Sequence, residues 1–274
     1  MRNLIAIAGA LALALFYMPV AAQEDHDHGH HDHNHEHAHE HDHAHDHAHD
    51  HAHGEMVGEG TPPEEHDGET RIGDAWPLDT CVVSGQELGS MGEPIVKLHE
   101  GREVRFCCAG CIPRFEANPD EYLEKADEKI VESQLKFYPL THCIADPAEE
   151  LTGDAEIDIR RVIGNRLFIF CCPGCDTHAT ERPVMFIEAL DEKVIEAQKE
   201  DYPLDTCVVA GMDLDAMGGP YDIVHANQLV RFCCAGCVGR FNADPVAHME
   251  KIEEAREHAT TTAETTGDDH SEHH

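Results

Sequence analysis

The feature that most constrains this chain is a six-residue motif, Phe-Cys-Cys-x-Gly-Cys, which occurs at residues 106–111, 170–175 and 232–237. One further cysteine precedes each copy, and each of these single cysteines follows shortly after an aromatic-Pro-Leu sequence. The three motifs and the three single cysteines account for all 12 cysteines of the chain. A period of 62 to 64 residues that keeps every thiol in register indicates three tandem repeats organised around their cysteines.

Each repeat is too small to be stable on apolar packing alone. A module of about 60 residues buries little apolar surface, so such modules are usually stapled by disulfides or by a metal ion. The formal net charge of −36 disfavours nucleic acids and anionic membranes as partners, because both need clustered Lys and Arg. Metal ions are therefore the expected partners of this chain.

Residues 1–22 have the composition of a secretory signal peptide. Arg2 precedes an apolar run from Leu4 to about Met18, and small residues end at Ala22. This pattern predicts cleavage after Ala22, a periplasmic or secreted protein, and no stable membrane association after cleavage. The alternative is an uncleaved membrane anchor, for which the apolar run is short.

Residues 23–73 form a His- and Asp-rich segment with no apolar face, which predicts disorder. Alternating imidazoles on a flexible chain can place several rings on one zinc, copper or nickel ion. Free imidazole has a pKa of about 6.5, so bound metal should be lost below about pH 6. The alternative is a solvating linker without ligands. The candidate ligands are His26, His28, His30, His31, His33, His35, His37, His39, His41, His43, His45, His47, His49, His51 and His53.

The three repeats predict an α+β protein of small tandem modules at residues 74–135, 136–199 and 200–259, followed by a disordered tail at 260–274. In each module a knuckle holds the single cysteine, a β-hairpin follows, and a short helix begins within the cysteine motif. A second helix then starts at a proline with a capping residue before it. The pairs are Asn118-Pro119, Arg182-Pro183 and Asp244-Pro245.

Three thiols of each module should converge. Cys107 and Cys111 are four residues apart and share one face of a helix, while the hairpin returns the chain toward the knuckle that holds Cys81. The helix N-terminus should lower the thiol pKa values. A three-thiolate site suits Cu(I), or Zn(II) with a fourth ligand, at about one ion per module. The candidate ligands are Cys81, Cys107, Cys108, Cys111, Cys143, Cys171, Cys172, Cys175, Cys207, Cys233, Cys234 and Cys237.

The fourth ligand is open. The second cysteine of each motif is the nearest candidate, but strand alternation places it on the same face as Phe106 and its counterparts, which favours a buried structural cysteine. His99 and His225 occupy equivalent positions beside the hairpin turns. Five strand residues, or about 17 Å, separate them from the cysteine pairs, so we do not expect them to bind the same ion.

The single cysteine, the intervening hairpin and the Cys-x-x-x-Cys pair resemble the TRASH domain, a small heavy-metal module of the treble-clef type that is related to YHS domains. The matching sets are Cys81 with Cys107 and Cys111, Cys143 with Cys171 and Cys175, and Cys207 with Cys233 and Cys237. The resemblance covers most of residues 76–258 and implies metal sensing, trafficking or resistance. The middle copy departs from its neighbours, with Ala179 in place of a phenylalanine, and is expected to bind most weakly.

Two other readings of the cysteines remain. Cys-x-x-Cys at a helix start is typical of thiol–disulfide oxidoreductases, although the modules are short for that fold and Cys81 and Cys107 would have no role. Disulfide-stapled interaction modules would suit an oxidising compartment. The adjacent cysteines and the histidine segment favour metal, so we expect a non-enzymatic protein of metal buffering, delivery or resistance. A metal transporter or efflux component is a candidate partner.

Overall fold

The computed structural model describes residues 65–66 and 69–266 of the chain. The predicted signal peptide, the fifteen histidines at residues 26–53 and the end of the predicted tail lie outside these residues. No helix in the described part of the chain is long and apolar enough to cross a membrane.

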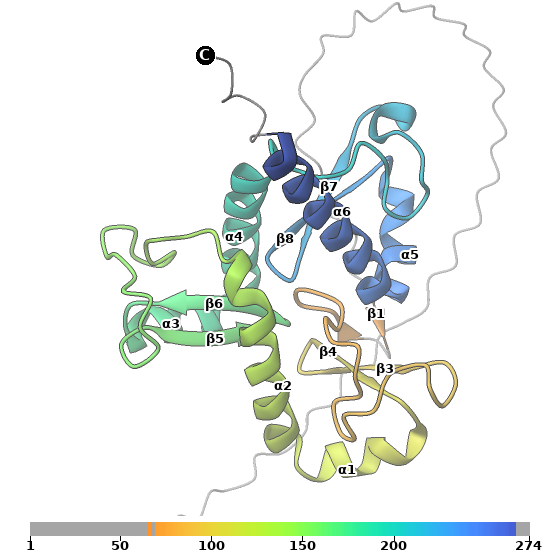
Figure 1. The fold of residues 1–274 in the computed structure, drawn as a ribbon. Helices are drawn as coiled ribbons and strands as arrows, with labels where there is room; N and C mark the ends of the chain where they lie inside the picture. Colours follow the sequence, from red (N-terminus) through yellow and green to blue (C-terminus); the bar gives the residue numbers. More distant parts are fainter. Residues whose placement is uncertain (1–64, 67–68, 267–274) are drawn as a thin grey trace, which may run out of the picture. The chain divides into compact units, whose positions relative to one another are not determined.

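The three modules repeat one order of elements, which Figure 1 shows along the chain. Two residue pairs before the first module, β1 (Glu65–His66) and β2 (Glu69–Thr70), form a small antiparallel ladder. Module 1 then consists of β3 (Ile95–His99), β4 (Arg102–Phe106), η1 (Ala109–Cys111), α1 (Ile112–Ala117), α2 (Pro119–Gln134) and η2 (Leu135–Phe137).

Modules 2 and 3 follow the same plan. Module 2 consists of β5 (Ile159–Ile163), β6 (Arg166–Phe170), α3 (Pro173–Glu181) and α4 (Pro183–Gln198). Module 3 consists of η3 (Leu214–Met217), β7 (Tyr221–His225), β8 (Gln228–Phe232), η4 (Ala235–Cys237), α5 (Val238–Ala243) and α6 (Pro245–Thr266). The predicted mixture of strands and helices is confirmed.

Each hairpin is a separate two-stranded antiparallel sheet with a two-residue turn. Both turn residues have positive φ in every copy, at Glu100-Gly101, Gly164-Asn165 and Ala226-Asn227. Paired positive φ angles give the turn whose twist matches the twist of the strands. The predicted hairpins are therefore confirmed, and the positive φ of Ala226 is notable because alanine seldom adopts this conformation.

Two predicted boundaries differ from the structure. Residues before 74 pack onto module 1, because the Ile72 amide donates to the Gly101 carbonyl at 2.7 Å and Arg71 pairs with Glu103 at 2.9 Å. At the other end, α6 continues to Thr266, beyond the predicted end of module 3 at residue 259. The sequence offers no proline or glycine between Pro245 and Gly267, so nothing stops the helix earlier.

Each module has its own apolar core, and the cysteine motif lies against it. In modules 1 and 3 a histidine ring meets a phenylalanine ring edge to face, with His99 against Phe115 and His225 against Phe241 at 5.2 Å between centroids. Module 2 has Ile163 and Ala179 at these places. Phe186 of α4 lies in the same cluster as both residues, so this aromatic ring occupies the core of module 2.

The hairpin of each later module is held by the helix before it. The Gln134 side chain at the end of α2 donates to the Asn165 carbonyl at 2.9 Å and accepts from the Leu167 amide at 2.8 Å. Gln198 at the end of α4 repeats both contacts with Asn227 and Leu229, each at 2.9 Å. Because a side-chain amide here completes backbone hydrogen bonds, each helix end is fixed to the next hairpin.

Modules 1 and 3 are also joined directly. The Arg105 guanidinium donates from Nη1 to the Ala243 carbonyl at 2.9 Å and from Nη2 to the Asn242 carbonyl, both at the end of α5. Its Nε donates to Glu103 at 2.8 Å. Each pair of modules therefore shares polar contacts made by buried side chains.

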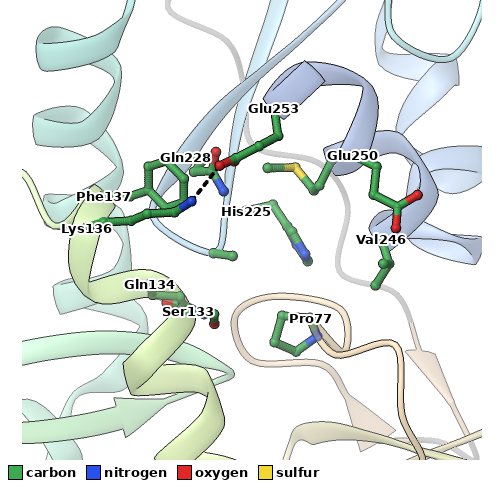
Figure 2. Close-up of a pocket in the computed structure, with 12 residues that line it drawn as sticks. Pro77, Ser133, Gln134, Lys136, Phe137, His225, Gln228, Val246, Glu250 and Glu253 are labelled. Atoms are coloured by element: carbon green, nitrogen blue, oxygen red, sulfur yellow. Dashed lines mark hydrogen bonds and ion pairs between the residues drawn. The ribbon is translucent and has the colours of Figure 1, made fainter. Parts of the chain in front are cut away.

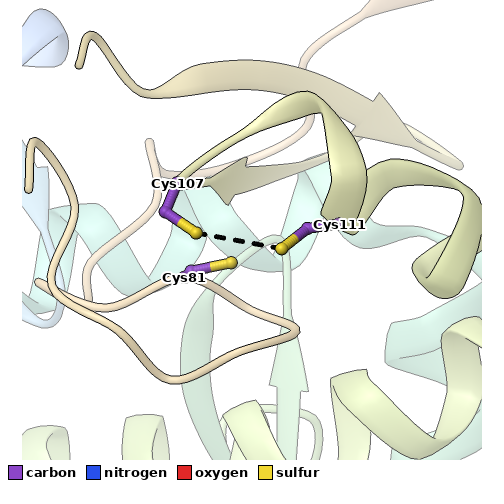
Figure 3. Close-up of side chains that lie close together, drawn as sticks. All are labelled: Cys81, Cys107 and Cys111. Carbon is purple, nitrogen blue, oxygen red and sulfur yellow. Dashed lines mark hydrogen bonds between the residues drawn. The ribbon is translucent and has the colours of Figure 1, made fainter. Parts of the chain in front are cut away.

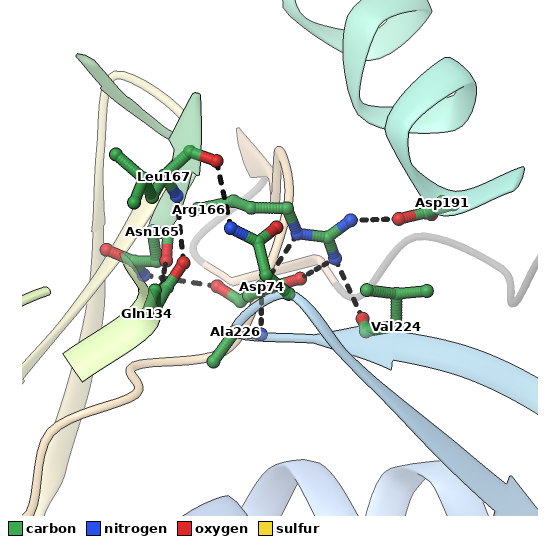
Figure 4. Close-up of polar contacts among 9 residues, drawn as sticks. Asp74, Gln134, Asn165, Arg166, Leu167, Asp191, Val224 and Ala226 are labelled. Carbon is green, nitrogen blue, oxygen red and sulfur yellow. Dashed lines mark hydrogen bonds and ion pairs between the residues drawn. The ribbon is translucent and has the colours of Figure 1, made fainter. Parts of the chain in front are cut away.

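A buried ion pair connects the start of module 1 with the hairpins of modules 2 and 3 (Figure 4). The Arg166 guanidinium is 1% exposed and bonds both carboxylate oxygens of Asp74, whose side chain is 3% exposed. Arg166 also donates to the Val224 carbonyl at 2.8 Å, and Asp74 accepts from the Ala226 amide at 2.7 Å. Arg166 also pairs with Asp191 of α4, so the charges are satisfied by one another and by backbone groups.

A cavity of about 290 Å³ lies between the end of α2 and the hairpin turn and helix of module 3 (Figure 2). Lys136 and Glu253 form an ion pair across it at 2.5 Å. His225 is one of the lining residues and is only 3% exposed. Burial lowers the pKa of the His225 imidazole to about 4; the Asp74 carboxylate acts against this, and the Arg166 guanidinium acts in the same direction as burial. The ring is therefore neutral at neutral pH.

This buried imidazole should make the protein acid-sensitive. The unfolded chain takes up a proton on His225 at about pH 6.5, whereas the folded chain does so only at about pH 4. The free energy of unfolding therefore decreases as the pH falls through this window, and the total decrease at the acid end is about 3 kcal/mol. His225→Ile, which copies Ile163 of module 2, should remove this part of the loss in urea unfolding series at pH 7, 5.5 and 4. An unchanged difference between pH 7 and pH 4 would contradict the assignment.

Candidate metal centre

The structure brings three thiols together in each module, as predicted. The groups are Cys81 with Cys107 and Cys111, Cys143 with Cys171 and Cys175, and Cys207 with Cys233 and Cys237, and within each group the sulfurs lie within 4.8 Å of one another. Figure 3 shows the first group, with Cys81 on the knuckle loop and the other two sulfurs on the returning segment and the helix start. We call these groups the thiol triads.

The sulfur spacing matches shared coordination of one ion. The two motif sulfurs of each triad lie 3.8, 3.8 and 3.9 Å apart in modules 1, 2 and 3. Thiolates at about 2.3 Å from one ion lie about 3.8 Å apart in a tetrahedral arrangement and about 4.0 Å apart in a trigonal one. A disulfide would need about 2.05 Å, and all twelve cysteines are free thiols in the structure. The triads are therefore compatible with metal binding.

The knuckle is a tight turn that presents its cysteine to the pair. In module 1 the Cys81 amide donates to the Gln86 carbonyl at 2.8 Å, and the Gly85 amide donates to the Cys81 carbonyl at 2.9 Å. Gly85 has a φ of 66°, which glycine adopts without strain. Module 3 repeats this turn with Gly211, whereas module 2 spans it with one more residue, from Cys143 to Glu149. Module 2 has 27 residues between its single cysteine and the first cysteine of its motif, two more than modules 1 and 3, and this residue is one of those two.

The knuckle thiols of modules 1 and 3 are the acidic members of their triads. Burial opposes ionisation of Cys81, but hydrogen bonds from Ser84 and from nearby backbone amides outweigh it and lower its pKa to about 7. The pKa of Cys207 is lowered in the same way by the Ala210 amide and its neighbours, against the effect of burial. Burial and the neighbouring thiols raise the pKa of Cys111 to about 12. Metal binding must therefore displace protons, so affinity should rise with pH.

The helix N-terminus acts on a different thiol from the one predicted. The backbone at Gly110 lowers the pKa of Cys108, and the backbone at Cys175 lowers the pKa of Cys172. The pKa values of Cys111 and Cys175 are instead raised, mainly by burial. The expected lowering for the paired thiols is wrong at these positions, because the residue that caps the helix is the second cysteine of the motif.

The second cysteines are not buried as expected. Cys172 is exposed, and Cys108 and Cys234 are half-buried. The strands end at the preceding phenylalanine positions, and Cys108 has an extended capping conformation with φ −162° and ψ 162°. Strand alternation therefore no longer applies to these residues. The triads do not include them, although Cys108 Sγ lies 3.9 Å from Cys111 Sγ.

The two histidines near the hairpin turns also lie outside the triads, as expected. Sequence reasoning missed two polar neighbours of the thiols. Ser84 Oγ lies 3.3 Å from Cys107 Sγ, and Arg240 Nη2 donates to Cys237 Sγ at 3.5 Å. Arg240 follows Cys237 by three residues on a helix, a spacing that places it beside the thiol and could have identified it.

The middle triad differs from its neighbours in burial and charge. All three thiols of modules 1 and 3 are buried, whereas Cys171 and Cys175 are only half-buried. The position that holds Arg240 in module 3 holds His178 in module 2, and Asp176 lies in the first turn of α3. The more open site should hold a cation less tightly, because water and chelators reach its sulfurs more easily, although the smaller positive charge beside its thiolates acts in the opposite direction.

Comparison of the chain with protein-family models, with curated protein sequences and with solved structures gives no match. The geometry of the thiol triads is therefore the main indication of function.

Module 2 should release its ion first. We expect its affinity to be at least about ten-fold below that of modules 1 and 3. The test adds a chelator stepwise to the metal-loaded protein, alkylates free thiols at each step and locates the label by peptide mass spectrometry. Label should appear at Cys143, Cys171 and Cys175 before the other triads, and a Cys143→Ser variant should lose this early phase alone. Simultaneous labelling of all three triads would contradict the prediction.

Proposed function

We propose that this protein binds soft metal ions, with copper and zinc as the leading candidates, and that it serves metal buffering, delivery or resistance outside the cytoplasm. The observation that carries the proposal is the threefold repetition of a triad whose sulfur spacing fits one ion. Buried thiols that repeat in register are not needed for packing alone, since apolar residues of similar size would fill the space.

The choice of metal depends on the coordination number. Three thiolates satisfy Cu(I), whereas Zn(II) needs a fourth ligand from the second cysteine or from solvent. The protein's acidic charge supports cation capture in either case. We further propose that the histidines of residues 26–53 collect zinc, copper or nickel ions, and that the relationship to TRASH and YHS domains reflects a shared metal-binding role.

The proposal assigns no substrate turnover to the protein. A thiol–disulfide oxidoreductase remains the second candidate, because Cys108 and Cys111 form a Cys-x-x-Cys pair at a helix start with sulfurs 3.9 Å apart. That activity would use only two of the four cysteines in each module. It would leave the buried knuckle thiol Cys81 without a role.

A joint metal and thiol assay tests the proposal. The chain from Gln23 is purified without oxygen beside a variant in which the fifteen histidines of residues 26–53 are asparagine, and both are analysed for metals and free thiols. The variant should hold about one ion per module, and its triad thiols should react with alkylating reagents only after chelation. Metal-free protein without reactive thiols would instead establish disulfide-stapled modules, and metal-free protein with rapid dithiol–disulfide exchange would favour the oxidoreductase.

A further inference from the structure

The second cysteine of each motif lies at the edge of a thiol triad without being part of it. We call Cys108, Cys172 and Cys234 the outer cysteines. The groups of sulfurs that lie within 4.8 Å of one another contain three members each and leave the outer cysteines out. Cys108 Sγ nevertheless lies 3.9 Å from Cys111 Sγ, which is contact distance for two sulfurs. An outer sulfur can therefore reach an ion held by the triad after a small movement.

The outer cysteines also reach solvent, unlike the triads they adjoin. In module 1 the triad thiols Cys81, Cys107 and Cys111 are 2%, 2% and 5% exposed. Cys108 and Cys234 are half-buried, and Cys172 is exposed. In modules 1 and 3 the outer sulfur is thus the one thiol that borders both the buried site and the surrounding water.

A glycine keeps each outer sulfur uncovered. A Cβ atom added to Gly110, Gly174 or Gly236 would lie 3.8, 3.9 or 3.7 Å from the sulfur of the outer cysteine in the same module. The outer sulfur therefore lies over the glycine in the same way in all three modules. Because these distances are ordinary contacts, alanine would fit there but would cover one side of the sulfur.

These observations argue against the two simpler roles. A structural cysteine would be packed within the core, as the triad thiols are. A permanent fourth ligand would lie about 4 Å from all three triad sulfurs, whereas no outer sulfur lies within 4.8 Å of all three. The position of the outer cysteines is instead that of a ligand that binds the ion only transiently.

We propose that the outer cysteines are exchange ligands, through which a soft ion moves from a buried triad to an external acceptor with thiolate or other soft donor atoms. This inference rests on the proposed metal binding by the triads. In the exchange a bond forms between the ion and the outer sulfur, and a bond to one triad sulfur breaks. The outer thiol releases a proton and the freed triad thiolate takes one up, so no oxidant or reductant is needed. The acceptor then replaces the remaining sulfurs one at a time.

The test uses Cu(I) as the probe, in the chain from Gln23 with the fifteen histidines of residues 26–53 changed to asparagine. The parent is compared with a variant in which Cys108, Cys172 and Cys234 are serine, and with a second variant in which Gly110, Gly174 and Gly236 are alanine. Stoichiometry and affinity come from equilibrium competition, and the rate of Cu(I) transfer to a chromogenic chelator comes from stopped-flow absorbance.

We expect the serine variant to bind as many ions as the parent with similar affinity, but to transfer them at least about ten-fold more slowly. The alanine variant, which keeps every thiol, should be slowed in the same direction. An unchanged transfer rate at full stoichiometry would overturn the exchange role and leave metal binding intact. A further measurement replaces Cu(I) with Cd(II), whose thiolate complexes absorb in the ultraviolet. A clear loss of Cu(I) affinity together with weaker Cd(II)–thiolate absorption in the serine variant would also overturn the exchange role, because the outer sulfur would then be a permanent ligand. Absence of both Cu(I) and Zn(II) binding by the parent would overturn both proposals.

Discussion

Replacing Cys107 and Cys111 with serine should abolish metal binding by module 1 and unfold that module. Both thiols are buried in the core of the module beside Cys81, and serine binds soft ions poorly. Structural zinc sites in small modules supply on the order of 10 kcal/mol of folding free energy, which is more than such a module can lose. Backbone hydrogen exchange by mass spectrometry should show that the peptides of residues 95–134 lose their protection.

The matched control is Cys108→Ser, which removes a thiol from the same motif but leaves the triad complete. This variant should retain the metal and the protection of module 1. If the double variant kept native protection in a reduced sample with chelator present, the metal would not be structural. The apolar core around Phe106 and Phe115 would then be sufficient by itself.

Asp74→Ala should destabilise the protein by about 3 kcal/mol, the lower end for breaking a buried ion pair, because the Arg166 guanidinium loses its buried carboxylate and keeps only the partly exposed Asp191. Arg166 is 1% exposed, and the Ala226 amide would lose its acceptor in the same step. Since Asp74 contacts the hairpins of modules 2 and 3, the loss should appear in the unfolding of more than one module. Urea unfolding of the metal-loaded protein, monitored by circular dichroism, measures the change in the free energy of unfolding.

The control for this prediction is Lys193→Ala, which removes the exposed ion pair between Lys193 and Glu196 at 3.0 Å. An exposed pair contributes about 0–1 kcal/mol, so this variant should unfold like the parent. A loss below about 1 kcal/mol for Asp74→Ala would mean that Asp191 and water together compensate Arg166 after the substitution. The connection between modules would then depend on Gln134 and Gln198 instead.

Much of each module could be predicted because it depends on local sequence. The positive φ angles of Gly164 and Asn165 and the prolines that open α2, α4 and α6 follow from the residue types themselves. The triads could be predicted because the hairpin links two cysteine segments whose order repeats. The end of α6 could not be predicted as well, because the last turns of this helix consist of polar residues and small alanines and have little apolar periodicity.

The errors at the second cysteines have a different cause. Strand alternation applies only while the strand continues, and β4 ends at Phe106, one residue before the motif's first cysteine. The contacts between modules were not predicted either. Gln134 and Gln198 repeat in register, but a glutamine at a helix end resembles any solvated residue until its buried partners Asn165 and Asn227 are known.

The direct contact between Arg105 and the end of α5 has a consequence for the number of repeats. In an open array each repeat touches only its neighbours, so copies can be gained or lost by duplication with little effect on the rest. Here the first copy contacts the third as well as the second. An inserted or deleted copy would separate Arg105 from the Ala243 carbonyl and leave the two terminal nitrogens of a buried guanidinium without their acceptors. The fold therefore requires three repeats. Related proteins should differ in their loops and metal ligands more often than in the number of repeats.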